Sequence, residues 1–502
     1  MPHPAIAGNA DKKIGPAGAG SQSETIGTAE DTTMKRSKAF RKLVFVLVNA
    51  ALTFSLAVCA QAQTVRFLAE FTNPNDSPDG LIQGTDGNLY GTGYWSGAFG
   101  FGDVFRMTPS GHLTTIYSFP CEGTCAEGRN PYLMVLGSDG NFYGVTVYGG
   151  EGSSGTFYKV TPGGKFTLLH TFCSDSTCSD GKNPNGLFLG NDGNFYGTTE
   201  SGGEWNQGVF FRISPTGNFK DLHSFCALSN CQDGSFPLSP IQGQDGNFYG
   251  TTAQGGTWGA GVIYKLSQAG NYQVIHDFCT QGDCAAGGVI QPLVQDAKGN
   301  FFGTTSFGGT HGYGTVFELT AEHQFKVLHS FNPSVEGGEP GGGAVLANDG
   351  NLYGVNLLGK YSDGTAYEVT PDGVFTVLYT FDVSGNEPYF PLFQGTDGLL
   401  YGSTNYYTNS NIAGTIFSLS NNLGPLVETV PTGGKVGKRI LILGNHLTGT
   451  TSVTFNGAPA EFTVEKDSFI RATVPEGATT GIVSVVTPSG TLNSNPQFVV
   501  TK

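Results

Sequence analysis

One short phrase recurs along the chain and restricts the fold more than any other feature. It reads Asp-Gly-Asn-Leu/Phe-Tyr-Gly, with a degraded fifth copy, and its seven copies begin at Asp86, Asp139, Asp192, Asp245, Lys298, Asp349 and Asp397. Successive copies start 53, 53, 53, 53, 51 and 48 residues apart. A fixed period of about fifty residues is typical of a propeller or another repeat array, in which neighbouring units bury one continuous core.

One repeat unit can be divided into four short strands. Residues 132–137 are apolar and lead into a Ser-Asp-Gly turn, and residues 141–147 form the second strand. A glycine-rich loop follows, and the third and fourth strands span residues 155–160 and 165–172. Four antiparallel strands, here named A to D, are the blade of a β-propeller.

The fourth strands show how the ring closes. Six D strands follow their C strands, at residues 113–119, 166–172, 219–225, 272–278, 325–331 and 375–381. The seventh unit ends after its C strand at 414–419, whereas residues 65–71 have the D pattern and precede the first A strand. The sequence therefore predicts an all-β fold, a seven-bladed β-propeller over residues 63–422 with N-terminal strand closure, which removes the exposed edges of an open array.

The end of the chain has a different pattern. Residues 425–502 lack the repeat phrase and alternate apolar and polar residues in short runs. The expected strands are 438–443, 452–455, 460–464, 469–474 and 481–487, separated by turn signals such as Asn456-Gly457. This pattern predicts a second domain over residues 423–502, an immunoglobulin-like β-sandwich.

Both parts resemble known families. The repeat phrase and the Gly-Thr-Val-Phe strand at 314–317 resemble the GloVer repeats of exported bacterial proteins, and also NHL-type propellers and the streptogramin lyase propeller. Residues 425–502 look like an IPT/TIG domain, through the segments 431–434, 442–445, 453–457 and 474–475. The GloVer resemblance implies a propeller and an exported protein, and it implies no particular activity.

The N-terminal region predicts export. A basic run (Lys35, Arg36, Lys38, Arg41 and Lys42) precedes an apolar stretch at 43–58, and Ala60-Gln61-Ala62 fits a cleavage site. We therefore expect a signal peptide at 34–62, with an uncleaved anchor as the competing interpretation. Residues 1–33 are interpreted as a disordered leader or a misassigned start. The expected localisation is secreted or cell-surface, without membrane contact after cleavage.

Eight of the nine cysteines fall into four short pairs that agree with export. The pairs are Cys121/Cys125, Cys173/Cys178, Cys226/Cys231 and Cys279/Cys284. Zinc is the alternative, because paired cysteines can be ligands. An even number of closely paired cysteines on an exported chain predicts four disulfide bonds instead, each within one D–A loop. We expect no metal and no cofactor.

Composition limits the partners. The formal net charge is −15, which argues against nucleic acid or an anionic membrane surface, since both attract basic patches. The predicted partners are a polysaccharide, a cell-wall component or a protein.

Two repeated polar groups have structural explanations. The Asp of the repeated phrase could bind metal, but its carboxylate is expected to hold the A–B turn by accepting backbone N–H groups. His170, His223, His276 and His329 recur in the D strands, where Tyr117 and Tyr379 stand in other units. We expect rings packed between blades at these positions, and a catalytic use is the alternative.

The B–C loops are the predicted binding region. They vary in sequence and carry all three tryptophans, on the face where the D–A loops also emerge. The candidate ligand-binding residues are Tyr94, Trp95, Trp205, Trp258, Tyr313, Tyr361, Tyr406 and Tyr407. Aromatic rings beside polar side chains suit a glycan or a peptide.

The sequence contains none of the common catalytic motifs that we considered, and we assign no catalytic residue. The leading prediction is therefore an exported binding protein. The first alternative is a lyase or hydrolase with its site at the mouth of the central channel, which the streptogramin lyase resemblance implies. The second is a structural spacer or assembly protein.

Overall fold

The computed structural model describes residues 64–71, 78–279, 284, 288–359, 364–381, 387–405 and 414–501. Within these ranges the structure is almost entirely β, and the only helical element is the 3-10 turn η1 (Ser229–Cys231). The strands form ten sheets, of which three lie after residue 425 and seven contain a copy of the repeat phrase. None of the described residues forms an apolar helix long enough to span a membrane.

The seven repeat sheets have the same strand order, A-B-C-D, with antiparallel neighbours. The first three comprise β2 (Pro78–Gln83), β3 (Leu89–Gly93), β4 (Asp103–Met107), β5 (Leu113–Ser118); β6 (Arg129–Leu136), β7 (Phe142–Tyr148), β8 (Thr156–Val160), β9 (Phe166–Thr171); and β10 (Lys182–Leu189), β11 (Phe195–Ser201), β12 (Val209–Ile213), β13 (Phe219–Ser224). The sixth comprises β24 (Gly338–Leu346), β25 (Leu352–Leu358), β26 (Thr365–Val369) and β27 (Phe375–Thr380).

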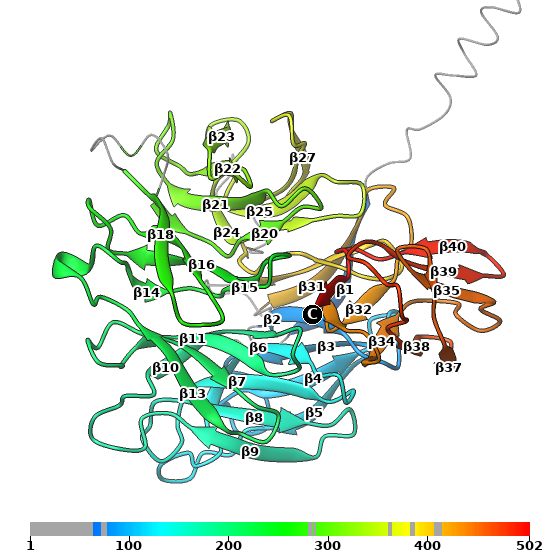
Figure 1. Ribbon diagram of the computed structural model, residues 1–502. Helices are drawn as coiled ribbons and strands as arrows, with labels where there is room; N and C mark the ends of the chain where they lie inside the picture. The colour runs from blue at the N-terminus through cyan, green and yellow to red at the C-terminus, as the bar shows by residue number, and fades with distance from the viewer. Residues whose placement is uncertain are drawn as a thin grey trace, which may run out of the picture. The chain divides into compact units, whose positions relative to one another are not determined.

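In the other three repeat sheets the A strand is split into two pieces. These sheets comprise β14 (Ser235–Pro237), β15 (Ile241–Gln242), β16 (Phe248–Gln254), β17 (Val262–Leu266), β18 (Tyr272–Asp277); β19 (Gly288–Ile290), β20 (Val294–Gln295), β21 (Phe301–Phe307), β22 (Thr315–Leu319), β23 (Phe325–Ser330); and β28 (Glu387–Pro388), β29 (Phe393–Gln394), β30 (Leu400–Asn405), β31 (Gly414–Ser420) with β1 (Thr64–Phe71). Figure 1 shows the sheets arranged around a central axis, with β6, β15 and β20 close to it and β9, β18 and β27 farther out.

The expected strands agree with the observed ones to within a few residues. The six D strands end one residue before the predicted limit, because the final Phe leaves the ladder and bonds to the neighbouring loop. For example, Phe119 N donates to Gly102 O at 2.9 Å and its ring is fully buried.

The N-terminal strand pairs with the last C strand, as the sequence predicts. β1 runs antiparallel to β31, from Thr64 opposite Ser420 to Phe71 opposite Gly414. Phe71 is 5 % exposed and packs edge-on against Phe105 of the first repeat sheet, with ring centroids 5.7 Å apart. Phe67, by contrast, is 41 % exposed. The strand therefore joins the last sheet to the first mainly through Phe71.

The Asp of the repeat phrase holds the A–B turn, as expected. In the second copy the Asp139 carboxylate accepts Asn141 N at 3.1 Å, Asn141 Nδ2 at 2.7 Å and the Tyr143 hydroxyl at 2.9 Å. In the degraded fifth copy Asp296 takes over this role, accepting both Lys298 N and Asn300 N at 2.8 Å. The carboxylate is thus used in hydrogen bonds within the turn.

The Tyr-Gly pair of the phrase is required by packing across the sheet. A Cβ at Gly144 would lie 2.4 Å from the Tyr158 hydroxyl, because this aromatic residue of the C strand lies directly across from the glycine. The Tyr143 ring packs against Phe195 of the next sheet, with centroids 4.3 Å apart. The phrase therefore encodes a turn, a close approach within the sheet and a contact between sheets.

Glutamine side chains at the ends of A strands connect neighbouring sheets at the A–B turns. Gln242 Oε1 accepts Asn191 N at 2.9 Å, and Gln295 Oε1 accepts Gln244 N at 2.9 Å. Gln394 bonds to Asn348 N at 3.0 Å, and Gln83 bonds to Thr396 N at 3.0 Å. The equivalent position is leucine in the other three sheets, at Leu136, Leu189 and Leu346.

The C-terminal residues form a β-sandwich. One sheet has the order β32 (Glu428–Val430), β34 (Arg439–Leu443), β38 (Phe469–Thr473), β37 (Phe462–Lys466), and the other has β36 (Ala458–Pro459), β35 (Ser452–Phe455), β39 (Val483–Thr487), β40 (Gly490–Asn493). The short strands β33 (Gly433–Lys435) and β41 (Val499–Thr501) pair in parallel. The five expected strands are present, and five further strands of two to four residues were too short for the alternation pattern to indicate.

Strand β34 is buried on both of its faces. Ile440 and Ile442 belong to the core between the two sandwich sheets. Leu441 and Leu443 belong instead to a core shared with the repeat sheets, which includes Leu136 and is flanked by the partly buried Leu189. Two of the three leucines that replace glutamine thus lie where the sandwich packs against the A–B turns.

Polar contacts also hold the sandwich on the A–B side. Ser468 Oγ donates to Thr85 O at 2.7 Å, Lys438 Nζ donates to Asn191 O at 3.0 Å, and Asn495 Nδ2 donates to Leu346 O at 2.9 Å. The B–C and D–A loops lie on the opposite face, away from these contacts.

Candidate functional site

Four B–C loops begin with the same glycine pair. The pairs are Gly149-Gly150, Gly202-Gly203, Gly255-Gly256 and Gly308-Gly309, all with φ between +76° and +87°. A Cβ at Gly203 would come within 2.6 Å of Val209 and 3.0 Å of Ser224. The loop therefore turns back tightly over its own sheet before it reaches its variable residues.

The four predicted disulfides are present, each within one D–A loop. They join Cys121 to Cys125, Cys173 to Cys178, Cys226 to Cys231 and Cys279 to Cys284. In the first three of these loops the residues between the half-cystines are exposed, and Leu228 is 55 % exposed. The covalent bonds thus lie on the same face as the aromatic B–C loops.

Each disulfide is connected to one B–C loop by a backbone hydrogen bond. The carbonyl oxygen of the second cysteine accepts the N–H of the second glycine of the pair. The bonds are Gly150 N to Cys125 O (2.9 Å), Gly203 N to Cys178 O (2.9 Å), Gly256 N to Cys231 O (2.9 Å) and Gly309 N to Cys284 O (3.3 Å). A disulfide therefore restrains the base of the B–C loop that follows it.

The last residue of the D strand restrains the other side of the loop. Ser224 Oγ accepts Glu204 N at 3.2 Å, Asp277 Oδ2 accepts Thr257 N at 3.0 Å, and Ser330 Oγ accepts Thr310 N at 2.7 Å. The loops that carry Trp205, Trp258 and Tyr313 are therefore each held at two points near their base.

The rings of these loops point into solvent. Trp95, Trp205 and Trp258 are 42 %, 48 % and 57 % exposed, and Tyr313 is 37 % exposed. Tyr94 is half-buried and meets Trp95 edge-on, with centroids 5.2 Å apart. The structure shows no ring contact between Trp95, Trp205 and Trp258, so it places them on one face as separate exposed rings. Tyr361, Tyr406 and Tyr407 lie outside the described residues.

A loss of one disulfide should loosen its own loop and leave the others intact. We expect Cys173→Ser/Cys178→Ser to raise amide hydrogen exchange in residues 202–208, because the Cys178 carbonyl then lies on an untethered loop. Residues 255–261, which are held by the Cys226–Cys231 bond, are the internal control. Equal protection of residues 202–208 in both proteins would show that the disulfide does not hold this loop.

Two protein-family models match the chain, one over the repeats and one over the C-terminal sandwich. The model of the Gloeobacter/Verrucomicrobia repeat matches residues 77–292 and 283–458, and the model of the IPT/TIG domain matches residues 426–500. Together the repeat matches extend over well more than half of the chain. The chain belongs to the Gloeobacter/Verrucomicrobia repeat family. Its C-terminal sandwich is an IPT/TIG domain. No curated protein is similar enough in sequence to match the chain.

Solved propellers resemble this Gloeobacter/Verrucomicrobia repeat protein in fold. A streptogramin B lyase is 15 % identical, with a TM-score of 0.50, and covers 72 % of this chain and 98 % of its own. An inactive virginiamycin B lyase from Staphylococcus aureus, solved with quinupristin, is 14 % identical, with a TM-score of 0.51 and coverages of 72 % and 99 %. A fungal alcohol oxidase of the AA5 family, in complex with copper, is 14 % identical, with a TM-score of 0.50 and coverages of 88 % and 100 %.

The first repeat sheet contains two buried carboxylates, Asp79 and Asp103, which are candidates for a catalytic or metal-binding pair. Asp79 accepts Thr92 Oγ1 at 3.3 Å, and Asp103 accepts Thr115 Oγ1 at 2.8 Å and also bonds to Ser96. Burial raises the pKa of the Asp79 carboxyl well above its usual range. Over the described ranges, no group of three or more His, Cys, Asp or Glu residues could hold a metal ion.

The D-strand histidines pack between repeat units, as expected. His276 stacks on Phe325 of the next sheet at 4.1 Å, and His223 stacks on Tyr272 at 4.0 Å. Burial lowers the pKa of both rings to about 4, so they are neutral at pH 7. His170 stacks in the same way on Phe219 and also bonds to Asp180 (2.9 Å), whose other oxygen accepts Cys173 N (2.8 Å). These histidine rings therefore pack between neighbouring sheets.

Two features of the loop face went unnoticed in the sequence. One is the acidic residue before the Gly that ends four of the D–A loops (Glu127, Asp180, Asp233 and Glu336). In three of them, Asp180, Asp233 and Glu336, the carboxylate accepts backbone N–H groups of its own loop. The other is the bond from the second cysteine to the glycine pair. Both have a sequence signal, because the acidic residue and the Gly-Gly pair recur with the same period as the cysteines.

Proposed function

We propose that this chain is an exported binding protein, secreted or at the cell surface, that recognises a glycan or peptide through its B–C loop face. In this proposal the seven repeat sheets are the blades of a closed seven-bladed propeller, over residues 63–422. Residues 34–62 are the export signal, and residues 423–502 form the IPT/TIG domain.

The observation that carries the proposal is the concentration of exposed apolar side chains on one face. Besides the tryptophans, Phe99 (57 %) is exposed in a B–C loop, and Phe307 (39 %) is exposed at the end of a B strand where such a loop begins. The sandwich contacts the opposite, A–B side. Exposed aromatic residues gathered on an uncovered face are typical of binding surfaces.

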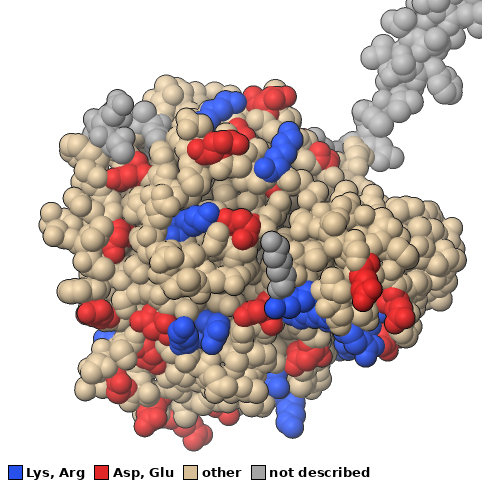
Figure 2. All heavy atoms as spheres, in the orientation of Figure 1, with Lys and Arg blue, Asp and Glu red and all other residues tan. Residues whose placement is uncertain are grey.

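The restraint of the loops supports binding rather than mere capping of the blades. A loop that is already ordered loses little conformational entropy when a ligand binds, so its contacts contribute more fully to affinity. Four disulfides, of the kind that persists outside the cytoplasm, support export and supply that order. Figure 2 shows basic and acidic side chains interspersed on the face in view.

The test is a glycan array combined with a pull-down on cell-wall polysaccharide and peptide, using the purified protein. For a ligand found in this way, Trp205→Ala and Trp258→Ala should each weaken binding roughly tenfold, because a buried aromatic contact contributes on the order of 1–2 kcal/mol. Phe67→Ala is the matched control, because Phe67 is an exposed ring on β1 away from these loops. If no such ligand binds, or if all three variants behave alike, the proposal fails.

A further inference from the structure

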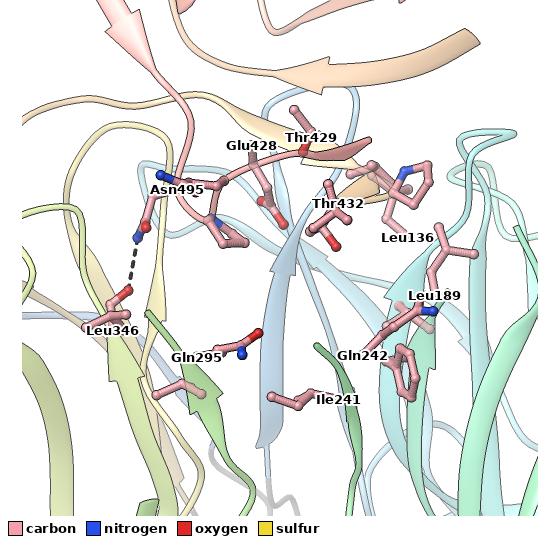
Figure 3. A pocket seen from close by; sticks show the side chains of 18 of the residues that line it. Leu136, Leu189, Ile241, Gln242, Gln295, Leu346, Glu428, Thr429, Thr432 and Asn495 are labelled. Atoms are coloured by element: carbon pink, nitrogen blue, oxygen red, sulfur yellow. Dashed lines mark hydrogen bonds between the residues drawn. The ribbon is translucent and has the colours of Figure 1, made fainter. Parts of the chain in front are cut away.

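A cavity of about 410 Å³ lies between the IPT/TIG domain and the A–B ends of the repeat sheets (Figure 3). Most of its wall consists of apolar side chains from six A strands, and these are Ile82, Val135, Phe188, Ile241, Val294 and Val345. The domain contributes residues 428–432, Leu443 and residues 495–497 and 499. The cavity therefore exists only because the sandwich lies over the end of the channel.

The amide groups around the cavity are already hydrogen-bonded. Gln295 Nε2 donates to Gly299 O at 3.1 Å, and its Oε1 accepts Gln244 N. Gln242 Nε2 donates to Gly246 O at 3.0 Å, and Asn495 Nδ2 donates to Leu346 O at 2.9 Å, the bond drawn in Figure 3. Each of these three amide nitrogens makes one hydrogen bond within the wall.

Glu428 is the only titratable residue among those that line the cavity. It begins strand β32, and Figure 3 shows its carboxyl group directed from the sandwich toward the A strands. In the part of the chain that the structure describes, this carboxyl has no hydrogen-bond or ion-pair partner. Lys438, the nearby cation of the same domain, donates its Nζ to Asn191 O instead.

An acid in this setting is costly for the protein to keep. Burial among apolar groups raises the pKa of Glu428 to about 7, so the carboxyl is close to half-ionised at neutral pH. Glu428 is half-buried by accessible surface, and its carboxyl group faces a mostly apolar wall. An ionised carboxylate in such a place is stabilised when a cation lies beside it.

We propose that this cavity binds a small organic cation, an ammonium group on an apolar body, with the Glu428 carboxylate as its counter-ion. The apolar ring of A-strand side chains encloses the body, and the volume lies in the range of small-molecule sites. This site is distinct from the loop face and lies at the opposite end of the molecule, so it stands or falls independently of the proposed function.

The experiment uses three probes with the same indole body and different charge. Tryptamine carries an ammonium group, tryptophol is neutral and indole-3-acetate is anionic. Isothermal titration calorimetry on the purified chain at pH 7.5 should show binding of tryptamine, roughly tenfold or more weaker binding of tryptophol, and none of indole-3-acetate.

Proton release provides a second readout. Binding of the ammonium group stabilises the ionised carboxylate, so tryptamine should release about half a proton at pH 7 and almost none at pH 9. Titrations in buffers of different ionisation enthalpy measure this number directly.

Glu428→Gln should abolish both the preference for tryptamine and the proton release. Glu461→Gln is the matched control, since Glu461 is an exposed carboxylate of the same domain. The proposal is overturned if tryptamine does not bind the wild-type protein, if the three probes bind alike, or if Glu428→Gln binds tryptamine as the wild type does. None of these outcomes bears on ligands of the Trp-bearing loops.

Discussion

A protein that lacks residues 64–71 should aggregate, or melt at least 10 °C below the intact chain. The deletion leaves one edge of β31 unpaired from Gly414 to Ser420, while the other edge still pairs with β30, and every residue of β31 except Ser420 is buried. It also removes the buried Phe71 ring from a core that contains Leu81, Phe105 and Ile416. Losing a strand ladder and a fully buried aromatic ring would consume most of the typical 5–15 kcal/mol of folding stability.

Two point variants separate this interpretation from a general effect of truncation. Phe71→Ala should lower the free energy of unfolding by about 3–5 kcal/mol, because the ring fills the junction of the last and first sheets. Phe67→Ala should change it by less than about 0.5 kcal/mol, because that ring is 41 % exposed on the same strand. A truncated protein that stays monomeric with an unchanged melting temperature would mean that the sheets do not need closure.

Truncation of the β34 side chains that face the repeat sheets should uncouple the IPT/TIG domain from the repeats. Leu441 and Leu443 are fully buried and point away from the sandwich core. Leu441→Ala and Leu443→Ala should each reduce the free energy of unfolding by about 2–5 kcal/mol, the usual effect of a leucine deletion in a core. The sandwich core itself is unchanged, so the double variant should show two transitions in calorimetry where the wild type shows one.

Val486→Ala is the matched control for these variants. Val486 is 37 % exposed on β39, in the other sheet of the same sandwich, and its truncation should leave the calorimetric profile unchanged. A single transition in the double leucine variant, at the wild-type temperature, would show that the contact through β34 does not couple the two parts.

The sequence predicted those features of the fold that are repeated or local. The phrase at Asp139 contains its turn, its glycine and its inter-sheet ring within six residues, and the half-cystines are at most five residues apart. Strand pairing within each unit follows from this order. Residues 65–71 could be recognised as a D strand because six other D strands in the sequence have the same pattern.

Features that depend on distant parts of the chain were not predicted. Ile440 to Leu443 is a continuous apolar run, and such a run indicates burial on both faces, but it does not identify the second partner. The change from glutamine to leucine at Leu136 and Leu189 has meaning only once the sandwich is seen to pack there. Glu428 resembles any strand-edge acid, since the side chains that enclose it come from six separate repeats.

The candidate loop site falls between these cases. The aromatic residues could be named from the sequence because the B–C loops are the variable part of a regular repeat. The hydrogen bond from a disulfide to the following B–C loop was not identified, because it joins a carbonyl oxygen to a glycine N–H and involves no side chain, although the cysteines and the Gly-Gly pairs recur with the same period.

The pairing of β1 with β31 also sets an order of events during synthesis. The first strand leaves the ribosome some 340 residues before its partner, which at about 5–20 residues per second is a delay of roughly 20–70 s. For that time Phe71 can contact only the first-sheet part of its core, which includes Phe105, and it lacks Tyr401 and Ile416 of the last sheet. The final docking step therefore joins the oldest and youngest parts of the repeat array, and it is a slow, non-local contact. A chain stalled before residue 414 would hold assembled sheets with an unclosed ring.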